Sequence, residues 1–193
     1  MLGYWVFIAF PVLFAILHSD SRKPNQWSLL FVALIYVFFI GLRDEVGPDW
    51  FAYLYKYKFL SDSSFIEGIA FTEPGFAILN WLVAKFDGGI YFVNTVIAAV
   101  LVSGVIRLAK LMPFPWLALI SVTPYLVIVI GMSAARQAVA IGLVFHLVAV
   151  WIQGAGLIKK TLYSLAAISF HYSAILSLLF VLQSIKMRSV YRW

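Results

Sequence analysis

The chain has 193 residues and a formal net charge of +6, with 64% hydrophobic and 11% charged residues. A soluble globular domain carries about 25% charged residues, so this composition excludes a water-soluble fold and indicates an integral membrane protein. The basic excess favours cytoplasmic loops and contacts with anionic lipid or phosphate, and no nucleic-acid partner is expected. Because the chain has no cysteine, disulfides, thiolate metal sites and cysteine nucleophiles are excluded.

Stretches without charged residues predict the membrane spans, since a spanning helix needs about 20 apolar residues. Six stretches are long enough: 1–19, 24–42, 88–106, 111–135, 137–158 and 161–185. A seventh, 74–84, has 11 residues and reaches only about halfway across a bilayer. We therefore predict an all-α polytopic membrane protein that forms one domain over residues 1–193, with six long transmembrane helices and one short or re-entrant helix.

The basic residues of the short loops predict the orientation in the membrane. Arg22 and Lys23 place the first loop in the cytoplasm, so that the stretch 43–73 is extracytoplasmic. If 74–86 dips into the membrane and returns, two later basic pairs, 107 with 110 and 159 with 160, also face the cytoplasm. If it crosses, both pairs face outside, and the basic residues at 85, 186, 188 and 192 face inside. We favour the re-entrant alternative, which keeps residues 43–87 as an extracytoplasmic loop with a short helix.

Seven of the eight acidic residues lie between residues 43 and 87, so functional residues are sought there first. Arg43 directly follows the second apolar stretch, and its guanidinium suits a phosphate group. Asp49 lies in the same loop and is a candidate to orient Arg43. Glu73 precedes Pro74, at the start of the predicted short helix. The alternatives are an ordinary helix-end anchor for Arg43 and a helix-dipole partner for Glu73.

The second half of the chain contributes three more candidates. Arg136 and Gln137 separate two long apolar stretches, and the second half of the chain contains no acidic residue that could pair with Arg136. An unpaired arginine near membrane depth costs about 2.5 kcal/mol or more, so Arg136 is expected to bind an anion unless its head lies in water. His171 lies near the middle of the last predicted span, where it is either a general base facing a wet cavity or a hydrogen-bonding group between helices. His146 is interpreted as a packing residue.

Four segments together resemble the EpsG family of bacterial polysaccharide polymerases, which parallel the Wzy-type O-antigen polymerases in role. They are GLRDEVGPDWFAYLYKY, EPGFAILN, ARQAVAIGL and FHYSAIL, in this order, and the match runs from Arg43 to Leu176. The resemblance implies a GT-C-like membrane glycosyltransferase that joins undecaprenyl-pyrophosphate-linked oligosaccharide repeat units. It places this activity in O-antigen or exopolysaccharide biosynthesis, at the outer face of the bacterial cytoplasmic membrane.

The resemblance also implies roles for single residues. His171 and Glu73 match the positions expected to act in catalysis, and four others match substrate-binding positions: Arg43, Asp49, Arg136 and Gln137. No cofactor is implied, and no metal site is predicted because the chain has no DxD pair. The implied partners are the lipid-linked glycan, membrane lipids, a flippase and a chain-length regulator. Since family members continue for several more membrane helices, the chain is expected to be the N-terminal part of a longer family fold.

Two other functions compete with this one. The sequence GMSA at 131–134 resembles the GxSG motif of rhomboid-type intramembrane serine proteases, with His171 as a base, but the second glycine and an HxxxN pattern are missing. A transporter or non-catalytic binding protein for anionic lipid-linked sugars would use the same arginines without chemistry. The sequence leaves this second alternative open.

Overall fold

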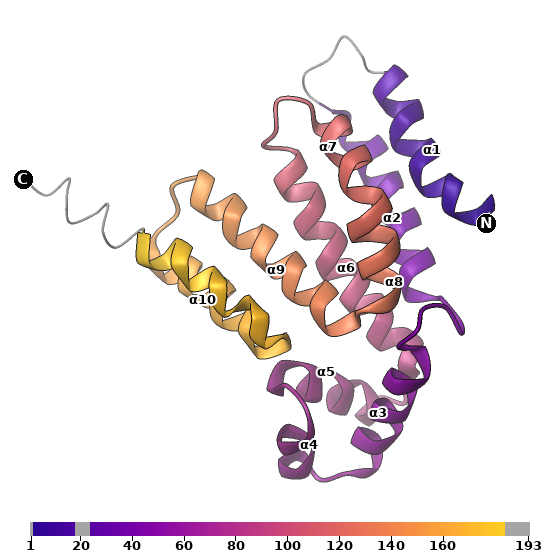
Figure 1. Cartoon of the computed structure of the whole chain (residues 1–193), viewed down its shortest axis with the longest axis vertical. Helices are drawn as coiled ribbons and strands as arrows, with labels where there is room; N and C mark the ends of the chain where they lie inside the picture. Colours follow the sequence, from indigo (N-terminus) through magenta and orange to yellow (C-terminus); the bar gives the residue numbers. More distant parts are fainter. Residues whose placement is uncertain (1, 18–23, 184–193) are drawn as a thin grey trace, which may run out of the picture.

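The computed structural model describes residues 2–17 and 24–183, and all regular structure in these ranges is helical (Figure 1). The helices are α1 (Leu2–Leu17), α2 (Gln26–Gly41), α3 (Trp50–Asp62), α4 (Phe65–Phe71), α5 (Pro74–Lys85), α6 (Gly89–Ala109), α7 (Pro115–Val122), the π-helix η1 (Thr123–Ile130), α8 (Gly131–Ser133), α9 (Ala135–Ile152), α10 (Leu157–Phe170) and the 3₁₀ helix η2 (Tyr172–Ser177). The predicted all-α fold is confirmed.

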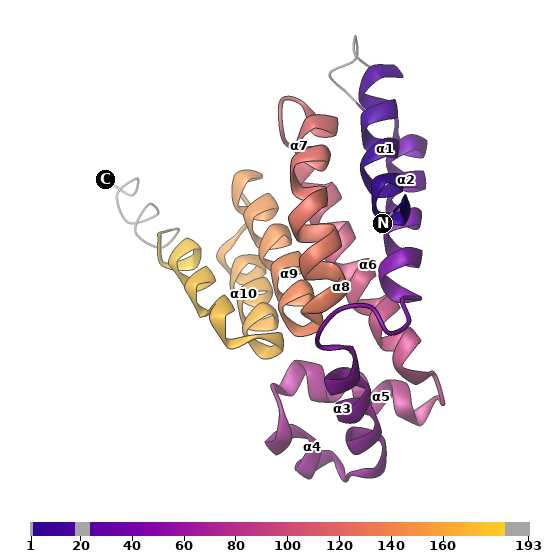
Figure 2. The same cartoon turned by 45° about the vertical axis from the view of Figure 1, so that its right-hand side comes forward.

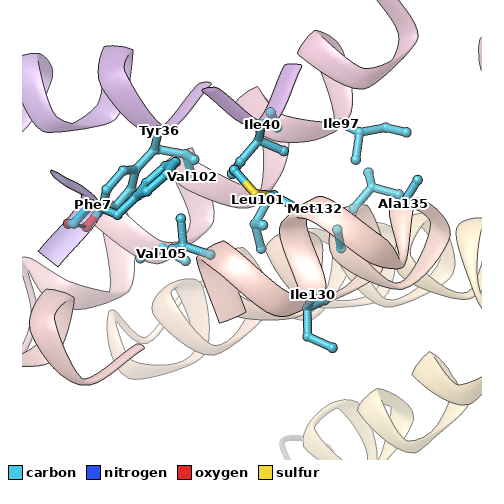
Figure 3. Close-up of a cluster of buried hydrophobic side chains, with 14 of the residues drawn as sticks. Phe7, Tyr36, Ile40, Ile97, Leu101, Val102, Val105, Ile130, Met132 and Ala135 are labelled. Atoms are coloured by element: carbon cyan, nitrogen blue, oxygen red, sulfur yellow. Dashed lines mark hydrogen bonds between the residues drawn. The ribbon is translucent and has the colours of Figure 1, made fainter. Parts of the chain in front are cut away.

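The long helices form a bundle around α6, which packs against α2 on one side and α9 on the other (Figures 1 and 2). Helix α1 lies beside α7 and α2. Ile40 of α2, Leu101 of α6 and Met132 of α8 meet in the buried core (Figure 3). These side chains are at most 6% exposed, so the helices are held together by close apolar packing.

Three helical stretches of the described chain are long and apolar enough to cross a membrane: Gly89–Ala109, Pro115–Ser133 and Ala135–Ile152. The second runs without a break through α7, η1 and α8. Shorter apolar helices cover Phe7–Leu17, Gln26–Gly41 and Tyr172–Gln183. The chain is thus a multi-pass helical membrane protein, and three of the six predicted long spans correspond to these candidate membrane-spanning helices.

The predicted single span over 161–185 is wrong. Helix α10 ends at Phe170, and His171 has an extended backbone with φ −158° and ψ 123°. The chain then turns back as η2, and the Ser164 and Ser177 hydroxyl oxygens lie 2.6 Å apart across the resulting hairpin (Figure 1). The Ser169 hydroxyl bonds the Ala166 carbonyl, and such side-chain bonds compete with the helical ladder. Apolar residues continue through this reversal, so a count of charge-free residues misses it.

Helices α3, α4 and α5 form a small cluster across one end of the bundle, at the bottom of Figure 1. Helix α5 packs against α3 and α4 within the cluster and against α6 and α10 of the bundle. It does not cross to the other end, because α6 begins immediately afterwards at the same end (Figure 2). The segment 74–86 is therefore a short helix lying over the bundle, and the ends of α6 and α9 lie at the opposite end.

Candidate functional site

Glu73, Arg136 and His171 meet where α5 begins, α9 begins and α10 ends; we call these three residues the Glu73 cluster. An Arg136 Nη1 atom donates a hydrogen bond of 2.5 Å to Glu73 Oε2. The Nδ1 atom of His171 lies 3.5 Å from the other carboxylate oxygen, Oε1. Three segments that are far apart in the sequence thus converge on one carboxylate.

The local sequence explains how Glu73 reaches this position. Glu73 is the N-cap residue of α5 and Pro74 is its first helical residue, a position that suits proline because no backbone N–H is needed there. A Cβ atom on Gly75 would lie 2.9 Å from the Ser169 carbonyl oxygen. Only glycine therefore allows the start of α5 to approach the last turn of α10, which ends next to His171.

Arg136 is the second residue of α9 and is held by two side chains from the end cluster. Besides Glu73, it hydrogen-bonds the side chain of Tyr53 on α3. The Thr72 hydroxyl also donates to Glu73 Oε2, at 2.8 Å. The expectation that Arg136 lacks an acidic partner is therefore wrong, because its partner comes from the first half of the chain. The buried Arg136 Nε has no hydrogen-bond partner among the described residues.

Glu73 is ionised at neutral pH. Its burial, to 5% exposure, raises the pKa, but hydrogen bonds from Arg136, a backbone N–H and Thr72, together with the Arg136 charge, outweigh this and lower the pKa to about 2. The carboxylate is thus a fixed negative charge beside His171. The His171 Nδ1 atom is buried without a hydrogen-bond partner among the described residues. The structure thus holds a negative charge 3.5 Å from a buried nitrogen of the imidazole.

Arg43 lies in the loop between α2 and α3 and is 5% exposed. Its Nη1 atom donates to the Gly131 carbonyl of α8 at 2.5 Å. Gly47, with φ 94°, lets the loop pack on α8, where a Cβ atom would lie 2.4 Å from the Met132 carbonyl oxygen. Burial lowers the Arg43 pKa to about 10, against the opposing effects of Tyr53 and Asp49. Arg43 therefore stays protonated at neutral pH, with its Nε atom buried and unpaired among the described residues.

The structure separates the other two predicted site residues from the Glu73 cluster. Asp49 is the exposed N-cap residue of α3 and forms no capping hydrogen bond. It acts on Arg43 only through its charge. Gln137 lines a cavity of about 250 Å³ between α9 and η2, together with Ser173 and Phe180. Neither residue takes part in the ion pairs of the Glu73 cluster.

Two residues of α3 belong to the site but were not singled out from the sequence. Tyr53 is buried, hydrogen-bonds Arg136 and lies within electrostatic reach of Arg43. The pKa of Lys56 is lowered by burial and by Arg136, with Glu73 and Asp49 opposing. Both residues lie in the aromatic segment that follows Arg43. Their spacing of three residues places them on one helix face, which is the signal that would have found them.

An apolar groove lies beside Arg43 at the same end of the bundle. It encloses about 480 Å³ and is lined by Arg43 and by large apolar side chains of α1, α2, the following loop and α8: Tyr4, Phe7, Phe38, Phe39, Leu42, Val46 and Met132. Arg43 is its one charged lining residue. A groove with this lining suits a hydrocarbon chain that ends in an anionic group.

Ser133 and the clustering of acidic and histidine side chains bear on two other kinds of site. Among the hydrogen bonds of residues 2–17 and 24–183, none joins Ser133 to His171, so a rhomboid-like serine and histidine pair has no support here. The same residues contain no group of three or more His, Asp or Glu side chains that could hold a metal ion. Metal-independent chemistry stays a prediction.

A comparison with protein families decides the classification. The EpsG family model matches residues 26–193, a range that includes the Glu73 cluster and Arg43. The chain belongs to the EpsG family. Membership of the EpsG family indicates a role in polysaccharide biosynthesis. No curated protein and no solved structure matches the chain.

Proposed function

We propose that this EpsG-family chain takes part in polymerising undecaprenyl-pyrophosphate-linked oligosaccharide repeat units. The observation that carries the proposal is the Glu73 cluster, in which a buried carboxylate pairs with Arg136 and faces His171. A histidine beside a fixed carboxylate is an arrangement suited to a general base. The reaction belongs at the outer face of the bacterial cytoplasmic membrane, where a flippase supplies the lipid-linked units and a chain-length regulator acts on the product.

The transfer has one proton to move and one leaving group to stabilise. A hydroxyl oxygen of the acceptor glycan attacks the anomeric carbon of the donor glycan and forms the new glycosidic bond. His171 accepts the hydroxyl proton, while the bond from the anomeric carbon to the lipid pyrophosphate breaks and its electron pair leaves with the pyrophosphate. Glu73, ionised because its pKa is about 2, stabilises the protonated His171 and is itself too weak a base for this step.

Cations near the leaving group supply the second requirement. Negative charge develops on the pyrophosphate during bond cleavage, and positive groups held in place stabilise it without reorganisation. Arg136 is already oriented by Glu73 and Tyr53, and Arg43 is oriented by Gly131. Arginine matches phosphate oxygens through two parallel N–H bonds. In this proposal Arg43 and Arg136 bind the pyrophosphate, while Asp49 and Gln137 contact the sugars.

The apolar groove supports a lipid-linked substrate in particular. Arg43 lines a groove whose other lining side chains are apolar or aromatic, and it retains a positive charge at neutral pH. A polyprenyl chain would lie in the groove with its pyrophosphate against Arg43. The same groove would also serve a transporter or a binding protein, so only a measurement of chemistry separates these functions.

The test is an assay with purified lipid-linked repeat units and the chain in its full-length context. His171→Ala should reduce polymer formation at least tenfold while retaining substrate binding, and Glu73→Gln should reduce polymer formation at least tenfold as well. Glu67→Gln is the matched control for Glu73→Gln, because Glu67 is exposed and caps α4. If both cluster variants polymerise at the parent rate, the catalytic proposal fails. If they lose binding but not the rate at saturation, the two residues bind substrate and do not act in catalysis. A parent chain that binds the lipid-linked units but forms no polymer would favour the non-catalytic function.

A further inference from the structure

A second group of polar side chains lies away from the Glu73 cluster, between α6, α9 and α10. Arg107 Nη1 lies 3.3 Å from His146 Nδ1 and donates to the Tyr163 hydroxyl at 3.3 Å. Arg107 Nη2 donates to Gln153 Oε1 at 3.1 Å. The interpretation of His146 as a packing residue without polar neighbours is therefore wrong. The neighbours come from α6 and α10, which the sequence of α9 does not reveal.

The hydrogen bonds of this group are consistent with a neutral His146. The His146 Nε2 atom lies 3.0 Å from the Ser103 hydroxyl, which in turn donates to the Val100 carbonyl. With its proton on Nε2, His146 donates to Ser103 and accepts from Arg107 through Nδ1. The His146 ring also stacks on Tyr163, with the ring centroids 5.5 Å apart. Arg107 is thus held in place by neutral partners, and its charge is not compensated by them.

A cavity of about 540 Å³ opens beside Arg107, between α2 and α6. Its polar lining consists of Arg107, Lys110, Gln26 and Ser103, and its apolar lining of Trp27, Leu29, Leu30, Ala33 and Ile106. No acidic residue lines it. Seven of the eight acidic residues lie in the segment 43–87, and the eighth, Asp20, lies outside the described residues. The cavity therefore has two cationic side chains next to an apolar surface.

We propose that this cavity binds an anionic phospholipid, with its phosphate against Arg107 and Lys110 and an acyl chain along the apolar face of α2. Basic pockets between transmembrane helices are the usual sites for anionic head groups. Trp27 and Leu30, which line the cavity, are 70% and 48% exposed, so the apolar wall continues onto the surface that faces lipid. Tryptophan favours the level of the head groups.

The location agrees with this ligand. The residues that line the cavity come from the first half of α2 and the last part of α6. The start of α2 and the end of α6 lie at the end of the bundle opposite α3–α5 (Figure 2). The short-loop charges predict that this end faces the cytoplasm, whose leaflet carries anionic lipid. The site is independent of the Glu73 cluster, so it stands whether or not the chain polymerises glycans.

The test compares lipid retention by the purified full chain in detergent, measured by native mass spectrometry with added phosphatidylglycerol or phosphatidylcholine. The parent should retain more phosphatidylglycerol than phosphatidylcholine. Lys110→Gln should weaken its retention about fivefold, the factor that one basic residue contributes near an anionic surface. Lys159→Gln is the matched control, because Lys159 is exposed on α10 and does not line the cavity. It should retain the lipid as the parent does.

Arg107→Gln is the second variant and should weaken retention at least as much as Lys110→Gln. If circular dichroism shows that Arg107→Gln fails to fold, the comparison of Lys110→Gln with Lys159→Gln alone tests the proposal. Equal retention of the two lipids by the parent would overturn the proposal, as would equal losses in the two lysine variants. Displacement of phosphatidylglycerol by millimolar inorganic phosphate would assign the cations to a free anion and overturn the lipid site.

Discussion

Glu73 is the residue on which the candidate site depends, because it pairs with Arg136 and faces His171. A buried carboxylate without partners would lose its charge, since desolvation penalises the ionised form. Here hydrogen bonds from Arg136 and Thr72 keep it ionised. Removing either member of such a pair leaves the other charge buried and uncompensated, which is costly.

Replacing Arg136 by lysine retains the positive charge but removes the fork that reaches Glu73 and Tyr53. We expect Arg136→Lys to reduce polymer formation about tenfold or more, since hydrogen bonds to charged groups contribute about 1.5–3 kcal/mol. Polymer amount and length in cells would be measured. Lys159→Arg exchanges the same two residue types at an exposed position of α10 outside the site and should leave the polymer unchanged. Polymer of normal length from Arg136→Lys would contradict a role for the guanidinium.

The Glu73 carboxylate also makes stability depend on pH. Its pKa is lowered from 4.5 to about 2 in the folded protein. The carboxylate therefore contributes fully to the free energy of unfolding above the ordinary carboxyl pKa, and this contribution is lost as the pH falls toward 2. Glu73→Gln should therefore unfold at a lower temperature than the parent at pH 7, and this difference should shrink between pH 5 and pH 3. Thermal unfolding in detergent measures it.

The exposed Glu67 provides the comparison for the pH experiment. It is bonded to Ser64 rather than to a cation, so Glu67→Gln should change the unfolding temperature less at pH 7. A difference between parent and Glu73→Gln that stays constant from pH 7 to pH 3 would show that the ion pair does not stabilise the fold.

Helices α5 and α10 approach each other closely at Gly75, which has no side chain. Gly75 faces Ser169 and Phe170 in the last turn of α10, and an added Cβ atom would meet backbone at 2.9 Å. This contact joins the helix that begins after Glu73 to the helix that ends before His171. The separation of the two side chains therefore depends on the packing of two helices.

Gly75→Ala should force α5 away from α10, because backbone atoms cannot move aside as a flexible side chain does. We expect a loss of stability of about 1–3 kcal/mol, typical of overpacking, together with reduced polymer formation. Gly156→Ala is the control, since no atom lies within 4 Å of a Cβ added there. Unfolding temperature and polymer amount are measured for both. Equal behaviour of the two variants would show that the α5–α10 contact tolerates a methyl group.

The whole molecule has two chemically different ends. Helices α3–α5 lie at one end of the bundle (Figure 1). The Glu73 cluster and Arg43 are next to these helices, whereas Arg107, Lys110 and the cavity beside them are near the end of α6. Net charge follows the same division, because the acidic residues from 44 to 87 belong to the first end. This asymmetry is expected when one end faces the cytoplasm and the other faces outside.

Single cysteines test this orientation cleanly, because the chain has none of its own. Asp62 and Lys159 are both exposed and lie on α3 and α10. In intact cells an impermeant thiol reagent should label Asp62→Cys and spare Lys159→Cys, and both should react after permeabilisation. Labelling of position 159 but not of position 62 would contradict the predicted orientation and would place the Glu73 cluster on the cytoplasmic side.

The sequence alone was sufficient for the membrane class, the all-α fold and the EpsG family, because composition and short motifs are local properties of the chain. It also named the three members of the Glu73 cluster, since each lies within one of those motifs. Only the tertiary structure decided that Arg136 pairs with Glu73 and that the chain reverses at His171. An ion pair between distant segments and a break within an apolar run depend on how helices pack, and hydropathy carries no information about either.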